Sequence, residues 1–502
     1  MSVQAVAPAK APTSATTSRG RIAFSVTVFL SAFLLFQIQL IVGKQLLPWF
    51  GGSAAVWNTC LVFFQILLLA GYAYSHFIAT RLKNAGTFAH LFPLLLSAAA
   101  LVYLALVWRS PVSPSLAWQP QNPDHPVWDL MKLLAISVGL PFFTLSATAP
   151  LLQTWFAHAN PTSSPYPLYA VSNLGSLLGL LTYPALFEPN LTLRNQGRLW
   201  ALIYFLFLGC CTICALRASS SRGSESDAHR TALAVKPSSE QRLLWLGLSA
   251  CGCIMLLSVT NLICQEIAVV PLLWVLPLAL YLLSFVLCFH RYPFYRRGVF
   301  HALFALAAAF GGILFLSGEN IGAKMQIVGF SLLLFAACMV YHGELARLKP
   351  HSQALTSFYM HIAVGGALGS VLIGIVAPLV FPAIWEFQLS LWFSGLVVAF
   401  ILLKEKTSWF YQHLRWLPLA VLTAVAGVAD LIGAAVTIFH VSPIYIHVFT
   451  GTLAAATLVA MVMGPSQRAR NPKWLWGAAL CGWCFLGLLF SVQAYRQKRD
   501  AV

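Results

Sequence analysis

Residues 22–43 read IAFSVTVFLSAFLLFQIQLIVG, a run that contains no Lys, Arg, Asp or Glu. An apolar run of about 18 residues or more is typical of a helix that crosses a membrane. Such runs recur along the chain, because only 9% of its 502 residues are charged, 59% are hydrophobic and the mean hydropathy is +0.79. A soluble domain carries roughly 25% charged residues. The sequence therefore predicts an all-α polytopic membrane protein.

The apolar runs divide into fifteen predicted spans. These are 22–43, 55–77, 87–108, 129–151, 167–187, 198–216, 243–264, 269–289, 298–317, 323–341, 355–381, 385–403, 416–438, 443–463 and 473–493. Each is expected to be a helix, because backbone amides in lipid must find their partners within the segment. The continuous run Ile66-Leu67-Leu68-Leu69-Ala70 does not alternate as the strands of a membrane β-barrel do.

Basic residues collect in alternate loops. With the N-terminus in the cytoplasm, Arg81, Lys83 and Arg217 fall inside, as does most of the charge that makes the chain +17. This asymmetry follows the positive-inside rule and predicts a multi-pass protein of the bacterial inner membrane with a cytoplasmic N-terminus. The basic charge is thus explained by topology, and no nucleic-acid partner is expected.

The number of spans has one open alternative. Fifteen spans leave Arg496, Lys498 and Arg499 outside, against the rule. Fourteen would result if the span that carries Asp430 re-entered the membrane without crossing it, since the loop that follows is short. Residues 1–21 are expected to form a disordered cytoplasmic tail.

The first twelve spans form two halves that resemble each other. The polar segment 217–242 separates residues 22–216 from residues 243–403, and residues 404–502 form three extra spans. Tyr169 precedes Gly175 and Gly179 at the same spacing at which Tyr359 precedes Gly365 and Gly369. Two parallel six-helix bundles joined by a cytoplasmic loop are the plan of the major facilitator superfamily, whose sites lie between the halves. The four glycines are expected to let helices pack closely.

Three passages carry a family resemblance. They run from Lys44 to His76, from Glu266 to Phe289, and from Tyr341 to Pro350. Together they resemble the membrane half of the fused major-facilitator/spermidine-synthase-like proteins of bacteria, and the likeness covers roughly residues 22–403. It implies a transporter-like fold. The soluble aminopropyltransferase-like domain of that family has no counterpart in this sequence, which contains no Gly-x-Gly-x-x-Gly after a strand.

Several polar groups are candidates for substrate binding or gating, because an ionisable group near the membrane core is costly. The candidates are Lys44, Glu266, His342, Glu344, His361, Glu386 and Asp430. Lys44 and Glu266 follow the first span of each half, so we expect them to pair at the outer mouth. Glu344 and Arg347 have the i, i+3 spacing of a helix ion pair and suggest, with His342, a cytoplasmic gate.

The remaining candidates are single groups. Glu386 lies near the outer end of its span, where it could attract a cation. His361 lies on the span of Gly365, and Asp430 lies in the middle of an apolar run. Each also has a plain structural interpretation, as a solvated loop position or a residue that is hydrogen-bonded to a neighbouring helix.

Two functions fit these observations. The first is a major-facilitator-type transporter of a small solute, possibly a polyamine or another organic cation. The alternative is a non-transporting membrane module that partners a separately encoded aminopropyltransferase-like protein. No enzymatic activity, metal or cofactor is expected, because the sequence contains no motif for one.

Overall fold

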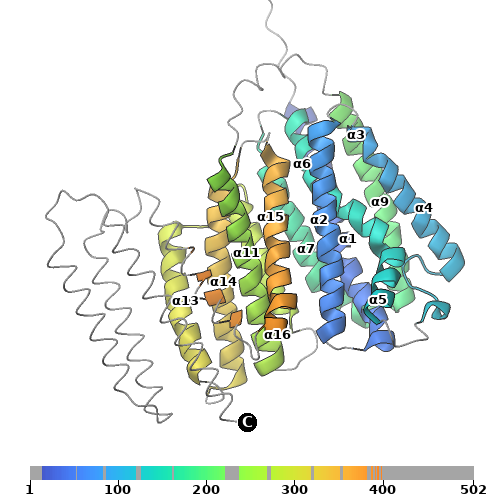
Figure 1. The fold of residues 1–502 in the computed structure, drawn as a ribbon. Coiled ribbons are helices and arrows are strands. Elements are labelled where there is room, and N and C mark those ends of the chain that lie inside the picture. Colours follow the sequence, from blue (N-terminus) through green and yellow to red (C-terminus); the bar gives the residue numbers. More distant parts are fainter. Residues whose placement is uncertain are drawn as a thin grey trace, which may run out of the picture. The chain divides into compact units, whose positions relative to one another are not determined.

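The computed structural model consists of long helices joined by short connections (Figure 1). It describes residues 14–51, 54–82, 86–119, 126–160, 163–220, 237–267, 273–317, 321–350, 354–380, 386–387, 390–391, 393–394 and 397. Most of the linker 217–242, more than half of the twelfth predicted span, the last three spans and Asp430 lie outside the described residues.

The helices of the first half follow the predicted spans. They are α1 (Ser14–Phe50), α2 (Ala54–Arg81), α3 (Gly86–Ala89), α4 (Leu91–Trp108), α5 (Pro126–Leu134), α6 (Leu140–Ala159), α7 (Tyr166–Thr182), α8 (Glu188–Asn190) and α9 (Leu193–Ser220). Helix α1 begins at Ser14, inside the segment that was expected to be disordered. A contact fixes its first turns, since Arg21 Nη2 donates to Ser163 Oγ at 2.6 Å.

The second half continues the pattern. Its helices are α11 (Ser239–Asn261), α12 (Val275–Phe289), α13 (Arg297–Ser317), α14 (Ala323–Arg347), α15 (Leu355–Val371) and α16 (Ala377–Val380). Nine helical stretches in the described part of the chain are long and apolar enough to cross a membrane, and Val275–Phe289 and Arg297–Gly312 are shorter apolar stretches. These spans agree with an all-helical polytopic fold.

Four π-helical segments interrupt this regular pattern within the residues that the structure describes. They are η2 (Ala135–Gly139), η3 (Tyr183–Phe187), η5 (Leu262–Ile267) and η8 (Leu372–Val376). Hydropathy does not predict them, because a π-turn depends on local packing and not on the apolar character of the run. Segments η3 and η8 hold corresponding places, since each directly follows a helix with a glycine pair.

The glycine pairs lie at close helix contacts. A methyl group on Gly175 would lie 2.5 Å from the Phe29 carbonyl oxygen, and one on Gly179 would lie 2.8 Å from the Phe33 carbonyl oxygen. Helix α7 therefore packs on the backbone of α1 with no room for a side chain.

The second half repeats this contact. A methyl group on Gly365 would collide with the Leu246 carbonyl oxygen, and one on Gly369 would lie 2.9 Å from that of Ala250. Helix α15 thus packs on α11 as α7 packs on α1.

The chain divides into two compact units, which do not follow the two halves of the sequence. The first comprises Met1–Leu257, Val270–His301 and Cys338–Ile375, and the second Ser258–Val269, Ala302–Ala337 and Val376–Val502. In the first unit, α12 packs along α7 and α15 packs along α2, and Figure 1 shows α15 beside α2. In the second unit, the Phe387 ring packs against the rings of Phe315 and Phe330.

Candidate functional site

Aromatic rings fill the contact of α7 with α12 and α15. The Tyr169 and Tyr359 rings stack with centroids 4.8 Å apart and planes inclined by 27°. The edge of Tyr169 also meets Phe289 at 4.8 Å and Phe285 at 5.5 Å. We call Tyr169, Phe285, Phe289 and Tyr359 the aromatic seam. All four residues are buried, and they join the first half of the sequence to the second.

Hydrogen bonds reinforce the aromatic seam at its edges. The Tyr359 hydroxyl donates to Oε1 of Gln153 on α6. The His76 Nδ1 atom on α2 lies 3.0 Å from Thr356 Oγ1 on α15. Helices α2 and α6 of the first half are therefore tied to α15 by side chains.

Two further tyrosines border the seam. Tyr281 on α12 packs against Phe285 of the seam, with ring centroids 5.3 Å apart, and Tyr72 on α2 lies near Tyr169. Both keep part of their surface accessible, whereas Tyr169 and Tyr359 are buried.

His342 lies next to the aromatic seam on α14 and is fully buried. Its ring stacks on Phe285 with centroids 3.5 Å apart, and its Nδ1 lies 2.7 Å from Ser284 Oγ. Its Nε2 has no hydrogen-bond partner among the described residues and faces Gly252 on α11, where a methyl group would lie 3.1 Å away. The predicted gate residue therefore contacts α11 and α12 through the interior of the first unit.

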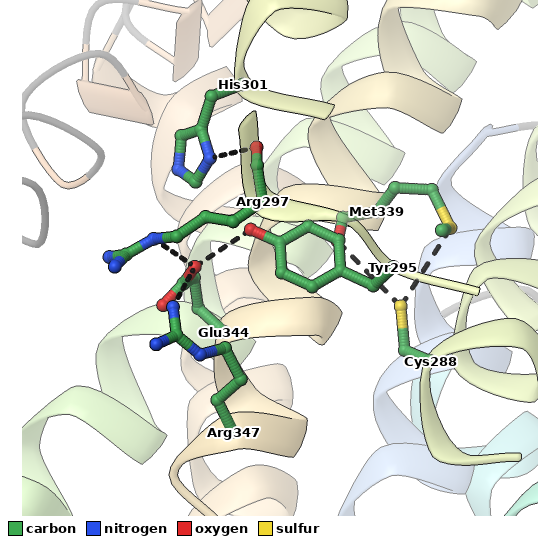
Figure 2. Close-up of polar contacts among 7 residues, drawn as sticks. All are labelled: Cys288, Tyr295, Arg297, His301, Met339, Glu344 and Arg347. Atoms are coloured by element: carbon green, nitrogen blue, oxygen red, sulfur yellow. Dashed lines mark hydrogen bonds and ion pairs between the residues drawn. The ribbon is translucent and has the colours of Figure 1, made fainter. Parts of the chain in front are cut away.

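Glu344 is the centre of a charged cluster two residues further along α14 (Figure 2). Its Oε1 lies 2.9 Å from Arg297 Nε and 3.4 Å from Arg347 Nη1, and it accepts a hydrogen bond of 2.8 Å from the Tyr295 hydroxyl. The Glu344 side chain is only 4% exposed, so these partners replace its water. The pair with Arg347 is the one that the i, i+3 spacing predicts.

Tyr295 joins this cluster from the connection before α13, and Arg297 joins it as the first residue of α13. Burial, followed by the charge of Glu344, raises the pKa of the Tyr295 phenol, so the phenol is a neutral donor at physiological pH. The ring packs against Gly343, where a methyl group would collide with it. Glu344 therefore holds the beginning of α13 against the end of α14.

Lys44 pairs with a residue other than the one expected. Its Nζ lies 2.6 Å from Glu188 Oε1, with side-chain exposures of 37% and 30%. Helix α1 continues past the first predicted span to Phe50, so Lys44 is a helical residue that reaches Glu188 at the start of α8. The side chain of Glu266 lies outside what the structure describes.

Glu386 and His361 make contacts of their own. In the second unit, Glu386 is 7% exposed and its Oε1 lies 3.4 Å from Asn261 Nδ2. His361 on α15 places Nδ1 2.7 Å from the Ser357 carbonyl oxygen, and its ring lies 5.8 Å from that of Trp245. No group of three or more His, Cys, Asp or Glu among the described residues could hold a metal ion.

Sequence reasoning did not identify the aromatic seam as a site. The signal was present, since Tyr169 and Tyr359 have the same spacing to their glycine pairs. That spacing indicated a repeat, but it did not indicate that the equivalent rings touch. Gln153 had no comparable signal, because its partner comes from a helix distant in sequence.

No protein-family model and no curated protein matches the sequence. Among solved structures, the fold is similar to the major facilitator superfamily proton:xylose symporter XylE bound to 6-bromo-6-deoxy-D-glucose, with a TM-score of 0.50 and 14% identity over 77% of this chain and 96% of that chain. The nucleoside transporter NupG gives a TM-score of 0.41 and 11% identity over 76% of this chain and 100% of that chain. The likeness to the symporter shows a multi-pass membrane protein with a major-facilitator-like fold.

Proposed function

We propose that the chain transports a small solute and that the aromatic seam is the contact that opens and closes during transport. The observation that carries this proposal is the stacking of Tyr169 on Tyr359, two residues at equivalent positions of a repeat. In transporters built from repeats, one bundle rocks against the other around a central site. A contact made by equivalent residues lies near the pseudo-twofold axis that relates the two halves, where it can close one side of the site.

The substrate class that we propose is a small organic cation. Tyr72 and Tyr281 are half-buried residues, and a tyrosine face attracts an organic cation by about 0.5–2 kcal/mol. A polyamine is the specific expectation from the family resemblance. The comparisons with known proteins support neither the synthase-like link nor a synthase-like partner, and no described contact favours the alternative of a non-transporting module.

A reversible cross-link tests the mechanism. In proteoliposomes, the double variant His76→Cys/Thr356→Cys should stop solute uptake when a short methanethiosulfonate reagent joins the two thiols, and a reductant should restore it. The distance of 3.0 Å between the native side-chain atoms makes this pair suitable. The matched control is Phe77→Cys/Thr356→Cys, because Phe77 is 56% exposed and lies next to His76 in the sequence. Unchanged uptake by fully cross-linked protein would contradict the gating role.

A substrate panel tests the class. Uptake of labelled polyamines, quaternary amines, sugars and nucleosides is compared between wild-type proteoliposomes and empty liposomes. Uptake of sugars or nucleosides alone would reject the organic cation but retain the transporter. Uptake of none of them by folded protein would count against transport itself.

A further inference from the structure

The connection between α12 and α13 exposes large aromatic rings beside arginines. Residues 290–296 read HRYPFYR, and we call them the basic aromatic turn. Tyr292 is 74% exposed and Phe294 is 66% exposed. Arg291 and Arg296 are exposed as well, and the Arg291 guanidinium lies 5.7 Å from the centroid of the Tyr292 ring. The turn therefore presents apolar rings and positive charge together.

The basic aromatic turn has a fixed shape. The Phe294 amide donates to the Leu287 carbonyl oxygen at 3.1 Å, and the Tyr292 amide donates to His290 Nδ1 at 3.2 Å. The Tyr295 hydroxyl, in the same turn, donates to Glu344 on α14. These three hydrogen bonds hold the backbone of the turn in one conformation, and this conformation exposes the rings of Tyr292 and Phe294.

The position of the turn suggests what covers it. It joins two apolar helices, Val275–Phe289 and Arg297–Ser317, and so it lies at the level where a membrane-spanning helix leaves the hydrocarbon. Tyr rings are enriched at this level because they have an apolar body and a polar end. The first turn of α13 contains no acidic residue, and the positive end of its helix dipole adds to the charge of Arg296.

We infer that the basic aromatic turn binds the headgroup of an anionic phospholipid. Arg291 and Arg296 would pair with the lipid phosphates, since the guanidinium group matches phosphate geometry with two parallel hydrogen bonds. The rings of Tyr292 and Phe294 would lie among the glycerol and upper acyl groups. Arg297 and Arg347 form ion pairs with Glu344 in the same region. We therefore assign the contact with the lipid to Arg291 and Arg296.

Binding of short-chain lipids to the full-length protein in detergent tests this inference. Native mass spectrometry would follow titrations with dioctanoyl phosphatidylglycerol and dioctanoyl phosphatidylcholine. We expect Arg291→Gln/Arg296→Gln to weaken phosphatidylglycerol binding roughly 20-fold, because each arginine near an anionic headgroup contributes about 5-fold. The control Arg194→Gln/Arg198→Gln removes the same charge from exposed positions at the start of α9, and it should bind as the wild type does.

Substitution of the two exposed rings distinguishes binding of a lipid from binding of a free anion. Tyr292→Ser/Phe294→Ser should weaken phosphatidylglycerol binding several-fold while leaving retention of inorganic phosphate unchanged. Equal binding of the two lipids by the wild type, or an equal loss in both arginine variants, would overturn the inference. Displacement of the lipid by millimolar phosphate would overturn it too, since it would indicate a general anion site. Melting curves of each variant establish that it is folded.

Discussion

The Tyr169 ring stacks on the Tyr359 ring, with their centroids 4.8 Å apart. Each tyrosine precedes a glycine pair at the same spacing, so the two residues are equivalent in the repeat. Two equivalent points of a twofold arrangement can touch only near its axis. The stacking therefore locates the axis that relates α7 to α15 within the first unit, and a substitution at either ring affects both halves of the sequence.

Removing the Tyr359 hydroxyl should destabilise the protein. Tyr359→Phe leaves Oε1 of Gln153 without its donor, and Gln153 is 1% exposed. A buried acceptor that loses its partner costs about 1–3 kcal/mol. The measurement is the melting temperature in detergent. Tyr103→Phe is the control, because Tyr103 is 65% exposed, and a loss of equal size in both variants would mean that the bond to Gln153 contributes nothing.

Adding one methyl group at a glycine seam should have a similar cost in either half. Gly175→Ala and Gly365→Ala each force a methyl group against a backbone carbonyl of the neighbouring helix, and overpacking costs typically 1–3 kcal/mol. Gly209→Ala is the matched control, since the space beside Gly209 is open and it too lies in a helix. If Gly209→Ala lowered the melting temperature as much as Gly175→Ala and Gly365→Ala do, the close helix contacts at Gly175 and Gly365 would be refuted.

Hydropathy predicted the helices better than it predicted their interruptions. Residues 22–43 lie within α1 and residues 323–341 lie within α14, because an apolar run in lipid can satisfy its amides only as a helix. The π-helical segment Tyr183–Phe187 was not expected. A π-turn is set by how side chains pack on neighbouring helices, and this information is not local.

The candidate site was predictable where its members are neighbours in sequence. Glu344 and Arg347 are three residues apart on one helix, and they pair. Tyr295 and Arg297 reach the same carboxylate from another element, and no spacing rule finds them. For Lys44, the argument from equivalent span ends selected Glu266, whose side chain lies outside the described residues, while the structure places Glu188 at the start of α8 beside Lys44.

Lys44 should be coupled energetically to Glu188. A double-mutant cycle with Lys44→Ala and Glu188→Gln should give a coupling free energy of about 0.2–1 kcal/mol, the range of partly exposed ion pairs. This is smaller than a buried pair would give, because the two side chains are 37% and 30% exposed. Thermal melts at low and high salt provide the measurement. A second cycle with Glu266→Gln should be additive within about 0.5 kcal/mol, and coupling there instead would restore the original expectation.

Cysteine labelling tests the orientation of the chain. If the positive-inside rule holds, Ser239→Cys at the start of α11 should react with an impermeant maleimide only after the membrane is permeabilised. Ala117→Cys should react in intact cells. Both positions are exposed, so accessibility within the protein does not decide the outcome. Reversed labelling would invert every inside and outside assignment, and with it the side on which Glu344 lies.

Glu344 should be the most sensitive charged residue of the first unit. Glu344→Gln leaves the guanidinium groups of Arg297 and Arg347 facing a neutral amide, and removing one partner of a buried ion pair costs about 3–5 kcal/mol. The arginines should rank by exposure. Arg297 is 19% exposed and Arg347 is 44% exposed, so Arg297→Gln should lower the melting temperature more than Arg347→Gln, which we expect to cost about 1 kcal/mol or less.

Tyr295→Phe completes the Glu344 series. It removes one neutral donor from the carboxylate and should cost about 1.5–3 kcal/mol, the range for a hydrogen bond to a charged group, with the ring still packed on Gly343. Melting in detergent and cysteine-specific labelling of the unfolded fraction measure the whole series. If Glu344→Gln and Arg347→Gln had the same melting temperature, the Glu344 carboxylate would be a solvated surface group in solution. If Glu344→Gln kept its melting temperature but lost uptake in proteoliposomes, the cluster would act in gating and contribute little to stability.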